Sequence, residues 1–223
     1  NASPTNGSSR PESRPDEPRV DIRGVIKYIG SKRVLVPRIV ETILAAWRAH
    51  APASHRPPVV FDLFSGTSRV GHALKRAGCR VVANDHNAYA HALARCYVEA
   101  DHTDRLIGRV SRLIAELNHL ASSLPDRPAD AEPNGGYIHD TFCLKSRFFH
   151  PSNGQRIDAC RERIAEWRTD GAIDDEVEAV LLVSLMEAAD RVDSTTGLQM
   201  AYLKQWAPRA FKPLNLRVPD LLP

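Results

Sequence analysis

One segment, residues 59–100, limits what this chain can fold into. Val59 to Phe64 is a short apolar run bounded by turn residues, which is typical of a buried parallel strand. A turn, a helix over residues 69–77 that ends at Gly78, and a second strand over residues 79–83 follow. Because a strand, a helix and a strand in this order form a parallel pair, the segment predicts the start of a doubly wound α/β sheet.

Further helices are predicted on both sides of this segment. Apolar residues recur at helical spacing over 31–48, 103–124 and 174–192, and another helix is expected to run through Trp167 after a loop at 151–154. Residues 1–18 are rich in Pro and polar residues, which predicts a disordered tail. Because Pro, Asp and Gly interrupt the chain at 125–136, we expect an α/β domain over 19–130 and a mainly helical region over 131–223.

Composition and charge narrow the function classes. No stretch of about 18 consecutive apolar residues occurs, which argues against a membrane span. The four cysteines form no C-x-x-C pair, so we expect reduced thiols in a cytoplasmic protein and no zinc site. The net charge is only +3, but residues 19–38 hold six basic side chains against one acidic one. Such basic stretches fit a nucleic-acid surface, although solvated surface charge explains them equally well.

The turn after the first predicted strand is the strongest local signal. Asp62 ends the strand, and Gly66 opens a turn into the following helix. The crevice at the carboxyl ends of strands is where α/β sheets bind ligands. Read as the G-x-G-x-x-G of dinucleotide sites, the segment fails at Ser68, where the glycine that admits a pyrophosphate is absent. S-adenosylmethionine carries no phosphate, so a site for it does not need a glycine at this position to admit one. The alternative is a βα turn that binds no ligand.

Two more segments favour a ligand site. Asp85 follows the second strand, 19 residues after Gly66, which is about where a carboxylate reaches a ribose hydroxyl, although it could also serve only as a helix cap. The segment from Lys27 to Lys32 brings two lysines, a tyrosine and a glycine to the start of a helix. This arrangement suits an anion such as a cofactor carboxylate, and a basic turn capped by Ser31 is the alternative.

Together these segments resemble the adenine-specific DNA methyltransferases of the Dam-like D12 class. The family's K-Y-x-G-[GS]-K segment corresponds to residues 27–32, its [DE]-x-F-x-G-[ST]-G loop to residues 62–68, and its N-D loop to residues 84–85. Its R-F-F-x-x-x-N-G-x-R-I-D stretch is similar to residues 147–158, and its later A-A-D, G and Y-L-K stretch to residues 188–204. The resemblance covers about residues 24–218.

This resemblance implies a partial Rossmann-like S-adenosylmethionine-dependent methyltransferase sheet with a helical recognition region. It implies transfer of a methyl group from S-adenosylmethionine to adenine N6 in double-stranded DNA, as in restriction–modification. The residues it assigns to the cofactor are Lys27, Tyr28, Gly30, Lys32, Asp62, Phe64, Gly66 and Asp85. The candidates for DNA contact are Lys145, Arg147, Phe149, Asn153, Arg156 and Lys204. Phe148 and Phe149 would stack on bases or, alternatively, pack in the core.

The chain departs from the family pattern in two places. Ser68 stands where many members have a second glycine. No Asp-Pro-Pro-Tyr or Asn-Pro-Pro-Tyr occurs, the tetrapeptide that holds the adenine amino group in this family. We therefore assign no catalytic residue and expect a truncated form without the catalytic C-terminal part. The alternatives are a non-catalytic cofactor- or DNA-binding remnant, a methyltransferase that acts on RNA and, more remotely, a nicotinamide-dependent oxidoreductase.

Overall fold

The two predicted strands lie side by side in the computed structural model, which describes residues 32, 34–51, 56–197 and 201–223. Strand β1 (Val59–Asp62) pairs in parallel with β2 (Arg80–Ala83), and helix α2 (Arg69–Arg76) connects them. The prediction of a parallel strand–helix–strand unit is confirmed. Strand β1 ends at Asp62 rather than at Phe64, because Leu63 and Phe64 belong to the exposed turn.

Helix α2 covers one face of this small sheet. Val60 and Val81 are half-buried on that face, whereas Val59 and Phe61 alternate with them and are exposed. Gly71 allows the close approach, because a β-carbon there would lie 2.9 Å from Val98 Cγ2 and 3.5 Å from Val81 Cγ1. The glycine therefore lets α2 pack tightly against Val98, whereas the distance to Val81 of β2 is that of an ordinary contact.

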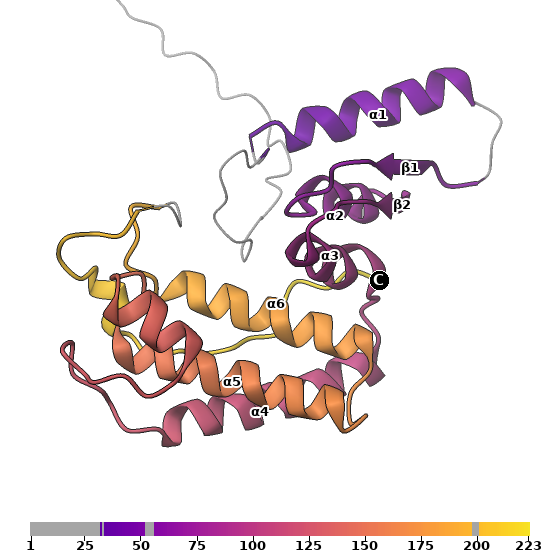
Figure 1. Ribbon diagram of the computed structural model, residues 1–223. Coiled ribbons are helices and arrows are strands. Elements are labelled where there is room, and N and C mark those ends of the chain that lie inside the picture. Colours follow the sequence, from indigo (N-terminus) through magenta and orange to yellow (C-terminus); the bar gives the residue numbers. More distant parts are fainter. Residues whose placement is uncertain (1–31, 33, 52–55, 198–200) are drawn as a thin grey trace, which may run out of the picture.

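Two helices flank this unit along the chain. Helix α1 (Val36–His50) packs against α2 and begins later than the start predicted at residue 31, with a proline in its first turn. Figure 1 shows it on the outer side of β1. Helix α3 (Ala88–Ala94) continues into a π-helical turn, η1 (Arg95–Glu99), and Cys96 and Tyr97 of this turn are buried. The predicted tail at residues 1–18 lies outside the described residues.

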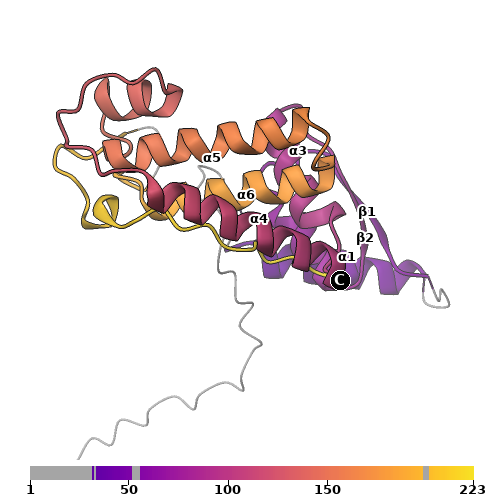
Figure 2. The same cartoon turned by 90° about the horizontal axis from the view of Figure 1, so that it is seen from below.

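Three long helices form the second part of the molecule. Helices α4 (Asp104–Ser123), α5 (Pro151–Thr169) and α6 (Asp175–Arg191) lie side by side in both views (Figures 1 and 2). The side chain of Thr103 caps α4 by accepting the N–H of Leu106, as the predicted helix over 103–124 requires. Short helical turns, η2 (His139–Leu144) and η3 (Pro208–Phe211), precede α5 and follow α6.

The loop predicted at residues 151–154 is wrong. Pro151 is the first residue of α5, and the side chain of His150 caps the helix by accepting the N–H of Ser152. Proline is well suited to the first helical position, where its missing N–H would have no partner within the helix. The Pro-Ser-Asn-Gly sequence therefore starts a helix that the same residues, by composition, predict as a turn.

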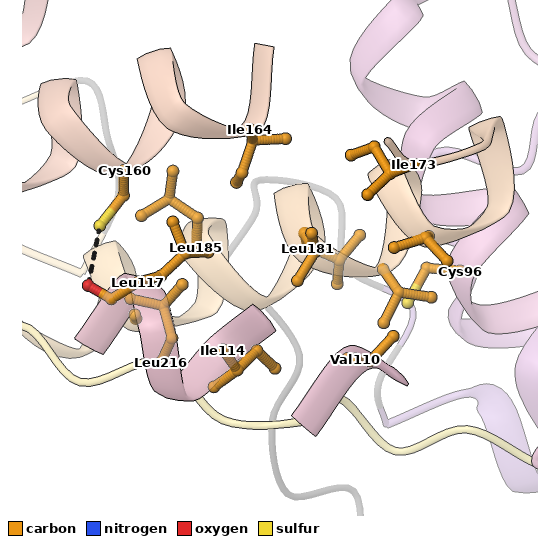
Figure 3. Packing of buried hydrophobic residues seen from close by; sticks show 14 of the residues in the cluster. Cys96, Val110, Ile114, Leu117, Cys160, Ile164, Ile173, Leu181, Leu185 and Leu216 are labelled. Atoms are coloured by element: carbon orange, nitrogen blue, oxygen red, sulfur yellow. Dashed lines mark hydrogen bonds between the residues drawn. The ribbon is translucent and has the colours of Figure 1, made fainter. Parts of the chain in front are cut away.

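One hydrophobic core joins the two parts (Figure 3). Helices on both sides of residue 130 contribute to it, so the packing is continuous across the predicted boundary. All four cysteines are free, and each is buried. No helix within the described ranges is long and apolar enough to cross a bilayer. The core side chains drawn together in Figure 3 include Cys96, Val110, Ile114, Leu117, Cys160, Ile164, Leu181 and Leu185.

The C-terminal segment ties the helical part to the strand part. The side chain of Asn118 bonds both backbone groups of Leu216, at 3.0 and 2.8 Å. Farther along, the N–H of His102 donates to the carbonyl of Leu222 at 2.9 Å, and His72 Nε2 contacts the carbonyl of Asp220 at 2.8 Å. Residues after 212 therefore return along the helices to α2, next to the predicted site.

Candidate functional site

The turn after β1 and the loop after β2 meet in one place. Asp85 Oδ2 accepts the N–H of Gly66 at 2.9 Å, and its Oδ1 accepts the N–H of Asn87 at 3.1 Å. The amide of Asn84 donates to the carbonyl of Leu63 at 2.9 Å. The structure therefore brings the glycine turn and the acidic loop together at the carboxyl ends of both strands, as their spacing predicts.

Two residues of this turn have a left-handed backbone conformation. Gly66 has φ +51°, and a β-carbon there would meet nothing within 4 Å, so space beside its backbone is open. Ser68 has φ 56°. This left-handed conformation is unfavourable for a residue with a β-carbon, whereas glycine adopts it without strain. It occupies the position where many family members carry glycine. The backbone requirement for glycine is therefore retained although the residue is serine.

The turn also buries polar groups without partners. The side chains of Ser65 and Ser68 are buried, and neither hydroxyl has a hydrogen-bond partner among the described residues. Buried polar atoms are normally paired, and exceptions together with strained backbone concentrate at functional sites. The turn therefore combines two features, unpaired buried hydroxyls and a left-handed serine, that a plain connecting turn does not require.

The pKa values of two carboxyl groups at this edge are shifted in opposite directions. Burial raises the pKa of Asp62 above its ordinary value, while the nearby Lys32 ammonium opposes the shift. The backbone N–H groups of Asn87 and Gly66 lower the pKa of Asp85. Asp85 is therefore held as a carboxylate with spare acceptor capacity, because each oxygen has lone pairs beyond the single backbone bond that it accepts.

Of the other predicted cofactor residues, the structure describes only Lys32 and Phe64. Lys32 is exposed and close enough to Asp62 for its charge to affect that carboxyl. Phe64 is 80% exposed in the turn, so its ring is available to a ligand. Lys27, Tyr28 and Gly30 lie outside the described residues.

Sequence reasoning missed a buried polar pair behind α2. The hydroxyl of Tyr97 donates to Glu187 Oε1 at 2.5 Å, and the ring of His72 packs 5.3 Å from the ring of Tyr97. Burial raises the pKa of Glu187, and its hydrogen bond with Tyr97 opposes the shift. The available signal was the single acidic residue inside the apolar stretch 179–189 of α6, which requires a buried partner.

Three of the predicted DNA contacts are exposed, and two of them, Arg147 and Lys204, lie together. Lys145, Arg147 and Lys204 are exposed, and the guanidinium of Arg147 donates to the carbonyl of Lys204. The same guanidinium lies over the ring of Trp206, 5.9 Å from its centroid. Phe149 is half-buried and lines an apolar cavity of about 490 Å³ between α3, η2, α5 and α6, so core packing accounts for part of its ring.

Asn153 and Arg156 are used inside the protein instead. The side chain of Asn153 is 2% exposed, and its amide donates to the carbonyls of Ala210 and Lys212, both at 2.9 Å. Arg156 donates to the carbonyl of Ala121 at 3.0 Å and pairs with Asp126 at 2.7 Å, beyond the end of α4. We leave both residues out of the DNA-facing set, because their donors are satisfied within the chain.

The rest of this stretch is also structural. Asp158 accepts the N–H groups of Ile138 and His139 at 2.9 and 2.8 Å and so caps η2. A β-carbon at Gly154 would lie 2.2 Å from Cys143 Sγ, so only glycine lets η2 pack on α5 here. The N-G-x-R-I-D pattern therefore holds three chain segments against the start of α5. Among the described residues no group of three or more His, Cys, Asp or Glu side chains is arranged to hold a metal ion.

Comparison with known proteins agrees with this geometry. Residues 28–222 match the model of the D12 class N6 adenine-specific DNA methyltransferases. The chain is 33% identical over 195 residues to the type II methyltransferase M.NlaIII of Neisseria lactamica, which covers 86% of this chain and 53% of that protein. It is 28% identical over 197 residues to the type II methyltransferase M.FokI of Planomicrobium okeanokoites, covering 88% of this chain and 29% of that protein.

A further relative is the modification methylase StsI of Streptococcus sanguinis, which is 27% identical over 194 residues, or 86% of this chain and 28% of that protein. The chain thus spans about half the length of the first of these relatives and less than a third of the other two. No solved structure gave a significant match. Since the family model matches most of the sequence, this chain belongs to the D12 class N6 adenine-specific DNA methyltransferase family.

Proposed function

We propose that this chain supplies the cofactor-binding turn and a DNA-facing surface of a site-specific methyltransferase. The reaction is transfer of a methyl group from S-adenosylmethionine to adenine N6 in double-stranded DNA. The observation that carries the proposal is the bond between Asp85 and Gly66, which places an ionised carboxylate beside an open glycine turn at the ends of two parallel strands. Three of the relatives carry names of type II methyltransferases or modification methylases, which supports the same activity.

The residues of the turn fit this cofactor chemically. A ribose diol needs hydrogen-bond acceptors, and the carboxylate of Asp85 has free lone pairs for it. An adenine ring needs an apolar or aromatic face, which the exposed Phe64 offers. We assign Lys27, Tyr28, Gly30 and Lys32 to the amino-acid end of the cofactor. When bound, S-adenosylmethionine supplies an electrophilic methyl group on sulfur, and Asp62, Gly66 and Asp85 fix its orientation.

The sheet around this turn is proposed to be a larger Rossmann-like sheet. The exposed apolar residues Val59, Phe61 and Val82 lie on the face that α2 does not cover, which supports further layers on β1 and β2. We propose that residues 19–130 bind the cofactor and that residues 131–223 recognise DNA. The free, buried state of all four cysteines supports a cytoplasmic location.

DNA contact is proposed for Lys145, Arg147 and Lys204, and for the half-buried Phe149. Basic side chains on phosphates fix the position of a protein on the duplex without reading sequence. The target adenine must leave the base stack before its N6 can be reached, at a cost of a few kcal/mol. Binding energy from this surface would offset that cost, and the recognised sequence would be set by other contacts.

The test is photolabelling of the purified chain with S-adenosylmethionine that carries a radioactive methyl group. Irradiation is expected to label peptides from residues 59–87, and S-adenosylhomocysteine is expected to compete. NAD at the same concentration is the matched control and is expected not to compete. Labelling outside both this region and the assigned residues 27–32, or competition by NAD alone, would reject the assignment.

A further inference from the structure

The four consecutive side chains of residues 147–150, which follow η2, have different surroundings. Phe149 faces the apolar cavity, and Phe148 packs edge-on against Phe142 and Tyr202, at 5.9 and 5.4 Å between ring centroids. Arg147 and His150 also contact the segment 201–212, at Lys204 and Trp206. Figures 1 and 2 show this segment at the end of the molecule that also carries residues 139–150.

The contacts of Arg147 and His150 form a continuous ladder, which we call the ring ladder. The guanidinium of Arg147 lies over Trp206, and the ring of His150 meets Trp206 edge-on at 5.3 Å. The ring of His150 also lies 5.1 Å from the ring of Phe211, between their centroids. Phe211 is 61% exposed, so the ring ladder, made of Arg147, Trp206, His150 and Phe211, ends in an open aromatic surface.

Hydrogen bonds hold this segment in place before any partner binds. Asn153 fixes the carbonyls of Ala210 and Lys212 on either side of Phe211. The N–H of Ala207 donates to the hydroxyl of Ser194 at 3.1 Å. An aromatic surface that is ordered in advance loses little conformational entropy when it binds, which favours a stacking role over simple exposure.

The charge around the ring ladder selects an anionic partner. Residues 141–150 and 201–212 contain no acidic residue. The guanidinium of Arg209 pairs with the buried Asp193 at 2.6 Å. The remaining basic residues of the two segments are Lys145, Arg147, Lys204 and Lys212, which are exposed. Basic side chains interleaved with exposed rings are typical of surfaces that bind single-stranded nucleic acid or bases outside the stack.

The neutral state of His150 suits the same role. Its Nδ1 accepts the N–H of Ser152 at the start of α5, which only the unprotonated nitrogen can do. Burial also lowers the pKa of His150. The facing groups Asp126 and Arg156 act on it in opposite directions. The ladder therefore presents aromatic rings near neutral pH, with its positive charge confined to the lysines and Arg147.

We propose that the ring ladder is a stacking platform for a DNA base that has lost its pairing partner, with Phe211 as the ring that contacts the base. Lys204 and Lys212 hold the flanking phosphates. This proposal rests on the proposed function, because adenine methylation in duplex DNA requires a base to leave the stack and leaves its partner unpaired. It adds Phe211 and Lys212 to the DNA contacts that the family resemblance implies.

The test compares the affinity of the whole chain for two labelled duplexes by fluorescence anisotropy. One duplex is fully paired, and the other carries a single unpaired base. We expect the wild-type chain to prefer the second duplex, and Phe211→Ala to lose about 5- to 150-fold in affinity for it, which is the range for one stacked base. Phe211→Tyr keeps the ring and should retain the preference, whereas Tyr137→Ala removes an exposed ring outside the ladder and should change nothing.

Three outcomes separate the ideas. Equal affinity of Phe211→Ala and wild type for the unpaired-base duplex overturns the platform while leaving the proposed function intact. An equal loss for both duplexes also overturns it, because Phe211 would then support duplex binding in general and not the unpaired base. Failure of the wild-type chain to bind either duplex, with binding to polyglutamate instead, would reject DNA as the partner altogether. Thermal unfolding of each variant checks that the fold is retained.

Discussion

The carboxylate of Asp85 holds the backbone N–H of Gly66 at 2.9 Å. These residues stand at the ends of neighbouring parallel strands, and the hydrogen bond closes the turn that would receive the cofactor. The same carboxylate fixes Asn87 at the start of α3. One side chain therefore links the turn, the second strand and the helix that follows.

Ser68→Gly is predicted to raise the free energy of unfolding by about 1 kcal/mol. Relief of the left-handed serine contributes about 1–2 kcal/mol, and removal of its unpaired hydroxyl adds to this. The greater freedom of glycine in the unfolded chain offsets part of the gain. Urea unfolding measures the difference. Ser122→Gly in the exposed face of α4 is the matched control, and it should lower stability by about 0.5 kcal/mol. A loss of stability at Ser68 would contradict the strain argument.

Gly71→Ala is predicted to lower the free energy of unfolding by about 1–3 kcal/mol, the usual cost of overpacking. The new methyl group would meet Val98 Cγ2 at 2.9 Å. Gly108→Ala in α4 meets nothing within 4 Å and should instead raise stability by about 0.5–1 kcal/mol. If the two variants change stability in the same direction, the close packing of α2 on η1 is not the reason for Gly71. Adding Val98→Ala to Gly71→Ala should recover part of the loss.

Asn153→Asp is predicted to destabilise the chain by about 2–4 kcal/mol, because a buried carboxylate would face two carbonyls in place of an amide donor. Asn215→Asp, at an exposed position, should change stability by less than about 0.5 kcal/mol. Chemical denaturation of both proteins gives the values. A stable Asn153→Asp protein with weakened DNA binding would restore Asn153 to the DNA-facing set.

His72 is predicted to make the protein less stable in mild acid. Burial lowers the pKa of His72, while its contact with the Asp220 carbonyl opposes the shift. The unfolded chain therefore binds more protons at this residue below its ordinary pKa of about 6.5. The stabilisation is fully present above that value and is lost as the pH falls toward the lowered folded pKa.

Urea unfolding at pH 7.5 and 5.5 checks this prediction in wild type and His72→Gln. Glutamine can still donate to the Asp220 carbonyl but does not titrate. The wild type should lose more stability between the two pH values than the variant does. Groups such as Glu187, whose pKa burial raises, titrate in both proteins and cancel in the comparison. Equal losses in both proteins would show that His72 does not titrate in this window.

The sequence predicted the parts of the site whose spacing is dictated by the fold. Asp62, Gly66 and Asp85 are placed by strand ends, and parallel strands bring their carboxyl ends to one edge whatever surrounds them. The family pattern, which has glycine at the position of Ser68, also indicated the backbone conformation there, since Ser68 adopts the left-handed conformation that glycine favours.

Other roles could not be read from residue types. Asn and Arg suit a phosphate and a buried backbone carbonyl equally well, so Asn153 and Arg156 looked like DNA contacts until their carbonyl partners were placed. Pro151 and its neighbours are favoured both in turns and at the first turn of a helix. The ring ladder depends on contacts between residues 56 or more positions apart, which no local pattern encodes.

Calorimetric titration of the chain with S-adenosylhomocysteine tests the central claim most directly. The cofactor-site assignment predicts one binding site per chain, and at least a tenfold weaker affinity in Asp85→Ala, because a charged acceptor is lost. Asp101→Ala, which removes an exposed carboxylate beside Lys75, is the control and should bind as wild type does. Undiminished binding by Asp85→Ala, or binding of NAD in place of S-adenosylhomocysteine by the folded chain, would contradict the account.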